Sequence, residues 1–208
     1  MNQAKDTTLS RREFIQAGLA TAAALALTAC AQEADSTQTT TQLAPTPACH
    51  DQDDHEETIS QTAGPFYTPN TPERTNLVEE GITGTPLLVT GQVLTTDCQP
   101  IAGALLDFWH ADDAGEYDNE GYRLRGHQFA DEQGNYRLET ILPGLYPGRT
   151  RHIHVKVQGK NTSLLTTQMY FPGESDNGGD GIFDPSLLMN VEDGDNGKVA
   201  SFNFVLES

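Results

Sequence analysis

The segment Pro143–Val155, PGLYPGRTRHIHV, gathers several side chains that can take part in chemistry. It holds Tyr146, two arginines, and the pair His152 and His154 in a His-x-His arrangement. Residues two apart on a strand point to the same face of a sheet, so these imidazoles are expected to project together. Adjacent imidazoles form a metal chelate. The same pair also fits two surface histidines on a half-exposed strand, and the pair alone does not decide between these alternatives.

A metal centre needs further ligands, and carboxylates are poorly placed to supply them. A cupin-type site would need a carboxylate three or four positions after His154, where the chain has valine and glutamine. The arrangement of two histidines and one carboxylate in ferrous oxygenases would have to use Asp107 or Asp112, whose spacing is not specific.

Tyrosines are the remaining donors. Tyr146 stands between two Pro-Gly turns, and Tyr117 follows a predicted strand in a glycine-containing loop. A phenolate is a hard anionic ligand that suits ferric iron better than zinc, and a strongly Lewis-acidic metal lowers the pKa of a bound phenol. The alternative is that both tyrosines only take part in aromatic packing.

The elements that must position these residues are short strands. Apolar residues recur with a period of two, without convincing helical periodicity, and turn sequences separate the segments. This pattern predicts an all-β protein, an antiparallel sandwich or barrel. The stretch 173–197 is rich in Asp, Asn and Gly but fails the EF-hand pattern, so a long irregular surface loop is expected there. The predicted strands cover residues 86–94, 104–109, 136–141, 152–157, 165–171 and 199–206.

The N-terminus has the features of an export signal. Residues 10–15, SRREFI, form a twin-arginine pattern, and residues 17–29 are a short run of small apolar residues. The run is too short to span a bilayer, and it ends in LTAC, which resembles a bacterial lipobox with Cys30 as the lipidated residue. We therefore expect 1–29 to be a twin-arginine lipoprotein signal peptide. The lipid on Cys30 would be the only membrane attachment, in the periplasm or on the cell surface.

The rest of the chain divides by composition. Residues 30–63 are rich in Thr, Gln, Asp, Glu and Pro, which predicts a disordered polar tether. Residues 64–208 have the size and pattern of one folded domain. Cys49 and Cys98 remain for a disulfide, which an oxidising compartment would permit, and two free buried thiols are the alternative.

The charge of the chain limits its partners. It has 12 basic and 30 acidic residues and a net charge of −18. A surface this acidic repels phosphate backbones, so nucleic acid is excluded as a partner. No apolar run after the signal is long enough for a transmembrane helix.

Four motifs together resemble the intradiol ring-cleavage dioxygenases, the family of catechol and protocatechuate 3,4-dioxygenases. The match covers most of the chain after Ala63, in the family's order, and the agreement of separate motifs makes it specific. The resemblance implies an antiparallel β-sandwich whose long loops carry a non-haem Fe(III) site. The motifs are GPFY at 64–67, PIAGALLDFWHADDAGEYD at 100–118, PGLYPGRTRHIH at 143–154 and TTQMYFPG at 166–173.

Carried over motif by motif, the resemblance also implies the residues of the site. Tyr146 and His154 would be the axial iron ligands, and Tyr117 and His152 the equatorial ones. Arg149 would offset negative charge that develops on the bound substrate. The remaining substrate-binding residues that the resemblance implies are Gly64, Pro65, Tyr67 and Gln168.

The activity that the resemblance implies is cleavage of a catechol ring by O2 between its two hydroxylated carbons, giving a muconate-type dicarboxylic acid. Such a reaction belongs to the catabolism of aromatic compounds, and Tyr146 would act in it as a base. An extradiol ferrous dioxygenase is disfavoured by the two tyrosines and the missing carboxylate. The alternative from another class is a non-enzymatic β-sandwich lipoprotein that serves as a binding module. The sequence leaves undecided the ring substituents, the role of Arg151 and assembly as a homo-oligomer.

Overall fold

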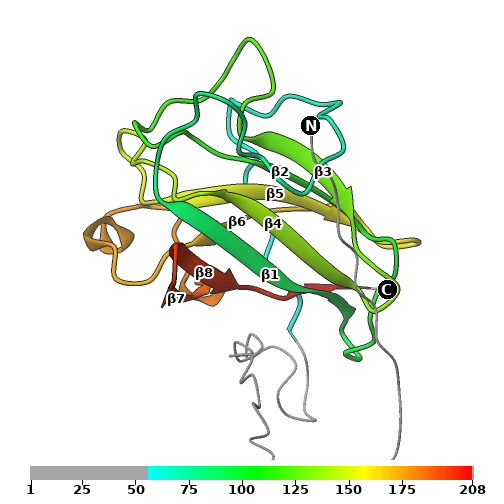
Figure 1. The fold of residues 1–208 in the computed structure, drawn as a ribbon. Helices are drawn as coiled ribbons and strands as arrows, with labels where there is room; N and C mark the ends of the chain where they lie inside the picture. Colours follow the sequence, from blue (N-terminus) through cyan, green and yellow to red (C-terminus); the bar gives the residue numbers. More distant parts are fainter. Residues whose placement is uncertain (1–55, 208) are drawn as a thin grey trace, which may run out of the picture. The chain divides into compact units, whose positions relative to one another are not determined.

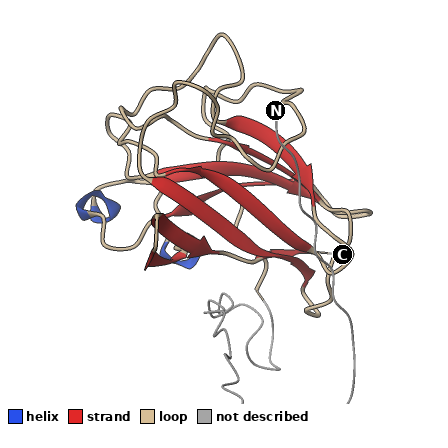
Figure 2. Cartoon of the chain, in the orientation of Figure 1, coloured by secondary structure: helices blue, strands red, loops and turns tan. Residues whose placement is uncertain are grey.

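The computed structural model describes residues 56–207, and this part of the chain is almost entirely β (Figure 2). Its helical elements are two short 3-10 turns, η2 (Ser175–Gly178) and η3 (Pro185–Leu187). The predicted all-β class is confirmed. Across the same residues, no helix has the length and apolar character needed to cross a membrane. The predicted signal peptide, Cys30 and Cys49 lie outside the described residues.

The strands form two sheets with the hydrophobic core between them (Figure 1). The sheet that we call the β5 sheet has the order β3-β2-β5-β6. The other, the β1 sheet, has the order β4-β1-β8-β7, and β9 also pairs with β1. The strands are β1 (Pro86–Thr95), β2 (Leu105–Trp109), β3 (Arg125–Phe129), β4 (Asn135–Ile141), β5 (His152–Gln158), β6 (Leu165–Tyr170), β7 (Asn190–Gly194), β8 (Gly197–Ser201) and β9 (Phe204–Leu206).

The pairing of β1 departs from the purely antiparallel prediction. It runs antiparallel to β4 but parallel to β8 and β9. The expected strand 199–206 is thus divided, because Asn203 turns its side chain to the ladder and its Oδ1 accepts the Gln92 N–H at 2.9 Å. Next to this break, a Cβ on Gly91 would lie 1.7 Å from the Phe202 carbonyl oxygen. Glycine is therefore required at position 91 of β1, which faces the break between β8 and β9.

The stretch 173–197 is not the irregular loop that its composition predicts. It contains η2, η3, β7 and the first residue of β8. The strands β7 and β8 pair up to Gly194 and Gly197, which enclose Asp195 and Asn196. The Asn-Gly step is a hairpin-turn signal, but β7 lacks the apolar alternation by which strands are recognised. The same lack of alternation explains why β3, RGHQF, was not predicted.

Residues 56–63 belong to the folded part and not to the tether in which their composition places them. The Thr58 N–H donates to the Val205 carbonyl at 3.0 Å, and the Thr58 hydroxyl accepts the Val205 N–H at 2.8 Å. The Gln61 N–H donates to the Thr166 carbonyl at 2.7 Å. The folded part therefore begins before residue 64. Backbone hydrogen bonds to β9 and β6 hold this segment, and composition carries no signal for such contacts.

Cys98 is disulfide-bonded and lies in the turn after β1 with a φ of 55°. The other cysteines of the chain, Cys30 and Cys49, lie outside the described residues. The pairing of Cys98 with Cys49 stays a prediction.

The side chains of the β5 sheet divide between two buried faces. Leu106, Phe108 and Val155 belong to the core between the sheets. Trp109 and His154 alternate with such residues along β2 and β5, so they lie on the opposite face. They are nevertheless only 0% and 3% exposed. The opposite face is therefore covered, and we call it the covered face of the β5 sheet.

Candidate metal centre

A row of four side chains crosses the covered face of the β5 sheet. The strand register pairs Arg125 with Trp109, Trp109 with His154, and His154 with Gln168. Directly paired residues point to the same face, so the register decides the neighbours of His154. The Trp109 ring stacks on the imidazole, with centroids 4.8 Å apart and an interplanar angle of 3°.

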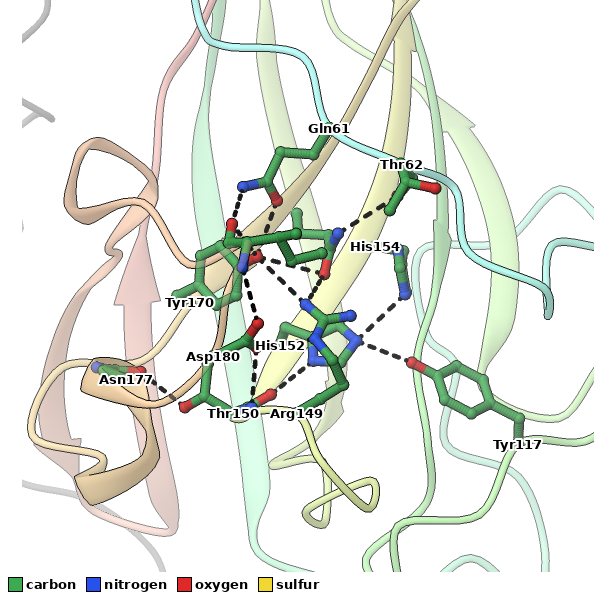
Figure 3. A network of polar contacts seen from close by, with 12 residues as sticks. Gln61, Thr62, Tyr117, Arg149, Thr150, His152, His154, Tyr170, Asn177 and Asp180 are labelled. Atoms are coloured by element: carbon green, nitrogen blue, oxygen red, sulfur yellow. Dashed lines mark hydrogen bonds and ion pairs between the residues drawn. The ribbon is translucent and has the colours of Figure 1, made fainter.

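Three of the predicted ligands meet beside this row (Figure 3). The Tyr117 hydroxyl lies 3.1 Å from His152 Nε2, and the Nε2 atoms of His152 and His154 lie 3.2 Å apart. The histidines come from β5, as their spacing predicts, and Tyr117 comes from the loop after β2. Within residues 56–207, no group of three or more His, Cys, Asp or Glu side chains could hold a metal ion. The oxygen atom that contacts the histidine pair is the Tyr117 hydroxyl.

The protonation of the two imidazoles suits metal binding. The Nδ1 atom of His152 lies 2.7 Å from the Thr150 carbonyl, so Nδ1 carries the proton and the lone pair of Nε2 faces the cluster. Burial lowers the pKa of His152 to about 4, although the Thr150 carbonyl opposes this shift. Burial and the neighbouring His152 lower the pKa of His154 well below its usual value. Both rings are therefore neutral at neutral pH, the form that binds metals.

His154 also has an unpaired polar atom. Its Nδ1 is buried and has no hydrogen-bond partner among the residues that the structure describes. A buried polar atom without a partner is costly, and such atoms concentrate at functional sites. A metal ion bound at the opposite nitrogen, Nε2, would explain why this ring is buried here, which packing alone does not.

The fourth predicted ligand, Tyr146, flanks the cluster. Its ring meets the Tyr117 ring edge-on, with centroids 5.8 Å apart. Phe66 joins the pair by stacking on Tyr117 at 4.5 Å and contacting Tyr146 at 5.3 Å. Burial raises the pKa of Tyr117, against the opposing charges of Arg149 and Arg125. Sequence reasoning missed Phe66 as a site residue, although it stands in the GPFY motif.

Arg149 and Gln168, both predicted, lie in contact. Arg149 Nη2 donates to Gln168 Oε1 at 2.7 Å, and Gln168 Nε2 donates to the Thr62 carbonyl at 3.3 Å. Gln168 is fully buried. Gln168 is the strand partner of His154, so this bond holds the guanidinium beside the cluster. The charge of Arg149 contributes to the lowered pKa of His152 and of His154.

The GPFY segment contributes in different ways. Gly64 lies over His154, since a Cβ at Gly64 would be 3.6 Å from His154 Cε1, and its φ is +65°. Pro65 is exposed. The Tyr67 hydroxyl donates to Asp107 Oδ2 at 3.1 Å, and its ring packs on Trp109 at 4.8 Å. Tyr67 therefore supports the Trp109 ring, which stacks on His154. The Tyr67 hydroxyl bonds to Asp107 and not to a residue of the cluster.

Arg125 holds two loops around the cluster, a role that no sequence signal indicated. Its side chain is buried, and Nη1 donates to the Phe66 carbonyl at 2.6 Å. Nη2 and Nε donate to the Asp118 carbonyl at 2.6 and 3.1 Å. These carbonyls belong to the segments that carry Phe66 and Tyr117. The guanidinium thus ties both aromatic rings to the sheet.

Arg151, whose role the sequence left undecided, joins two other loops. Its Nε pairs with Glu174 Oε1 at 2.7 Å, and Nη1 donates to the Pro143 carbonyl. It therefore links the start of the Tyr146 loop to the segment before η2.

The fold and the cluster define a β-sandwich protein with a phenol and imidazole centre on the covered face of one sheet. The chain belongs to the dioxygenase family, whose model matches residues 62–207. It is 33% identical over 141 residues to the catechol 1,2-dioxygenase of Candida albicans, a match that covers 54% of this chain and 46% of that one. It is 30% identical over 152 residues to a chlorocatechol 1,2-dioxygenase of Pseudomonas sp., covering 59% of each. The chain spans about half the length of the curated relatives it matches.

Solved structures match a larger share of the chain. The dioxygenase domain of a fusion with a carbohydrate-binding protein, from the cellulolytic bacterium Streptomyces sp. SirexAA-E, is 51% identical with a TM-score of 0.71. That match covers 73% of this chain and 99% of the solved one. A 3-chlorocatechol 1,2-dioxygenase from Rhodococcus opacus 1CP is 28% identical with a TM-score of 0.68, and 73% of each chain is covered. The predicted β-sandwich of the intradiol type is confirmed.

Proposed function

We propose that this protein is a non-haem Fe(III) dioxygenase that cleaves a catechol-type ring between its two hydroxylated carbons with O2. The product would be a muconate-type dicarboxylic acid. The observation that carries the proposal is the approach of the Tyr117 hydroxyl and His154 Nε2 to the same nitrogen of His152, at 3.1 and 3.2 Å. The catechol, chlorocatechol and hydroxyquinol 1,2-dioxygenases among its relatives support it. The non-enzymatic binding module has no comparable support.

The donor set fits ferric iron. Tyr117, Tyr146, His152 and His154 would hold the ion. Neutral imidazoles and a hard phenolate are ligands that iron accepts, and the set lacks the cysteines typical of structural zinc. Burial raises the pKa of Tyr117, so the phenol keeps its proton unless a strongly Lewis-acidic ion displaces it.

Each residue near the cluster has a role in the proposed reaction. When bound, ferric iron supplies the Lewis acidity that makes a chelated catechol reactive toward O2. Tyr146, at the edge of the cluster, accepts a hydroxyl proton of the substrate at its phenolate oxygen. Arg149, held by Gln168, donates hydrogen bonds toward negative charge that develops on the ring. Trp109 and Phe66 exclude water from His154 and Tyr117.

The visible absorption spectrum of the iron-loaded protein tests the proposal, recorded without oxygen before and after catechol is added. We expect a broad tyrosinate-to-iron band that moves to longer wavelength with catechol. Oxygen is then admitted as an isotopically heavy gas, and both atoms should enter a muconate-type product. A featureless spectrum at stoichiometric iron would remove the tyrosines from the ligand set. A semialdehyde product would instead indicate extradiol cleavage.

Export and anchoring form a separate part of the proposal. Residues 1–29 would direct export through the twin-arginine route, and the lipid on Cys30 would hold the protein at a membrane in the periplasm or on the cell surface. Substitution Cys30→Ser should release the protein into the soluble extracellular or periplasmic fraction. Substitution of Arg11 and Arg12 by lysine should retain it in the cytoplasm. Localisation that is unchanged by either substitution would contradict this assignment.

A further inference from the structure

Asp180, in the segment after η2, holds Arg149 through a partly buried ion pair. Asp180 Oδ2 accepts from Arg149 Nε at 2.8 Å, and the two side chains are 2% and 20% exposed. The same oxygen accepts the Thr150 N–H at 3.0 Å, and Oδ1 accepts the Ile182 N–H at 3.1 Å. Both carboxylate oxygens therefore have donors, as a buried carboxylate requires (Figure 3).

Gln168 is the second residue that holds Arg149. The contact runs from Arg149 Nη2 to Gln168 Oε1 at 2.7 Å, and Gln168 is the strand partner of His154. Two neighbouring donors of the guanidinium are thus fixed, Nε by Asp180 and Nη2 by a residue beside a proposed iron ligand. Two such anchors restrict rotation of a long side chain that otherwise has considerable rotamer freedom.

Asp180 also offsets the charge of Arg149. Burial alone would raise the pKa of the Asp180 carboxyl, but hydrogen bonds from Arg149, Ile182 and Thr150 outweigh burial and lower it, so the carboxylate is ionised. A cavity of about 390 Å³ borders Tyr146 and Arg149. Its lining includes Asp176 and Asp180, and Arg149 is its only basic residue.

The guanidinium groups of the neighbouring arginines are bonded to other residues. Arg151 is paired with Glu174 at 2.7 Å. Arg125 is buried and bound to backbone carbonyls. A ring that bears a carboxylate would have to give up hydration and would meet a guanidinium whose charge is already paired.

We propose that Asp180 is the positioning residue for Arg149 and that it sets the substrate class: catechols without a carboxylate on the ring. This inference rests on the proposed function, and it names the substrates that the same site takes. Arg149 keeps its hydrogen-bond donors for charge that develops during the reaction, while the ion pair presents little net charge to an incoming ring.

The test compares Asp180→Asn with Asp195→Asn, which removes the same charge from an exposed position in the turn between β7 and β8, away from the cavity. The ratio of kcat/KM for protocatechuate to kcat/KM for catechol is measured for each iron-loaded protein. The wild-type protein should favour catechol. Asp180→Asn should raise the ratio about tenfold, since it leaves Arg149 unpaired. Asp195→Asn should change it less than about twofold, because exposed charges are screened.

Binding of unreactive ligands gives a second readout. The Kd values of para-hydroxybenzoate and phenol are measured by calorimetry on the same iron-loaded proteins. The ratio of the two Kd values should move in favour of para-hydroxybenzoate in Asp180→Asn alone. Asp180→Glu keeps the charge, so it should lower kcat through altered positioning while it keeps the wild-type ratio.

Two outcomes would overturn the inference. One is a wild-type protein that cleaves protocatechuate as well as catechol. The other is an equal loss for both substrates in Asp180→Asn, which indicates a structural role only. If neither substrate is cleaved, the proposed function fails, and the Kd ratio still tests Asp180. If Asp180→Asn does not fold, a wild-type Kd ratio that favours para-hydroxybenzoate contradicts the inference, and one that favours phenol supports it.

Discussion

The two sheets of this protein differ in the burial of the face that points away from the shared core. On the covered face of the β5 sheet, Trp109 and Gln168 are fully buried, and His154 is 3% exposed. On the β1 sheet, the ion pair of Arg137 with Glu139 has side chains that are 55% and 43% exposed. Both sheets bury one face in the shared core. Within residues 56–207, the β5 sheet carries a second buried layer, formed by the loops that bring Phe66, Tyr117 and Tyr146 to its strands.

The difference shows in which part of the fold the burial of polar groups lowers stability. Burying imidazole and guanidinium groups is unfavourable unless they are paired. The covered face nevertheless holds His152, His154 and Arg125, with a polar atom of His154 left unpaired. Polar groups buried at such cost point to a site, whereas the exposed charges of the β1 sheet point only to a solvated surface.

The largest expected effect comes from removing a proposed ligand on the covered face. Substitution His154→Ala should reduce bound iron to less than about a tenth of stoichiometric. Catechol cleavage should fall at least about a thousandfold, since the Lewis acid is lost. His127→Ala on β3 of the same sheet is the control and should keep its iron. Elemental analysis and turnover assays measure both, and full iron in His154→Ala would contradict the ligand assignment.

Substitution Tyr146→Phe should lower kcat about a thousandfold, because it removes the base and one phenolate. The fold should be unchanged, as Tyr146 lies at the edge of the cluster and not in the core. Rates and circular dichroism are compared with those of Tyr122→Phe, which alters an exposed tyrosine. Unchanged turnover in Tyr146→Phe would count against its role.

Substitution Arg149→Ala should keep the iron but lower kcat about a hundredfold, since a hydrogen-bond donor toward developing charge is lost. Iron content and KM separate this effect from loss of the metal or of substrate binding. Full activity in this variant would remove Arg149 from the mechanism and would also leave Asp180 without a function.

The contact between the two sheets at His110 should make the free energy of unfolding depend on pH. His110, at the end of β2, is buried, and its Nε2 lies 2.7 Å from the Thr140 hydroxyl of β4. Burial lowers the pKa of His110 from 6.5 to about 4, although the Ala111 carbonyl opposes the shift. Between these two pKa values, the unfolded chain binds the proton more readily than the folded protein does. Stability therefore falls as the pH drops through this window, and it is unaffected above the window.

Urea unfolding of the metal-free protein measures this effect. Protonation of His110 should lower the free energy of unfolding by at most about 3 kcal/mol at low pH, since each pKa unit corresponds to about 1.4 kcal/mol. His110→Gln should show a shallower loss of stability between pH 6.5 and about 4. Identical slopes in the two proteins would mean that His110 is not the responsible group.

The smallest effect is expected on the exposed face of the β1 sheet. Arg137→Ala breaks the pair with Glu139, which solvent screens, so the free energy of unfolding should change by about 1 kcal/mol or less. Iron content and turnover should match the wild-type values. A large loss of activity in this variant would mean that both sheets serve the site, and the contrast between them would not hold.

Part of the fold and of the site could be predicted from local patterns. Alternation located most strands, and the spacing of His152 and His154 placed both imidazoles on one face. The strands β3 and β7 were not predicted, because they lack apolar alternation. The folding of segment 56–63 was not predicted either, because hydrogen bonds and not apolar residues attach it to the sheets.

The sequence by itself determined the side-chain directions in the strands that show apolar alternation and the motifs that identify the family, since both depend on adjacent residues. Only the tertiary structure decided that Tyr117 meets His152 at 3.1 Å and that Asp180, one acidic residue among 30 Asp and Glu in the chain, pairs with Arg149. Strand periodicity gives the face of a side chain, but which loops cover that face depends on packing between residues far apart in the chain.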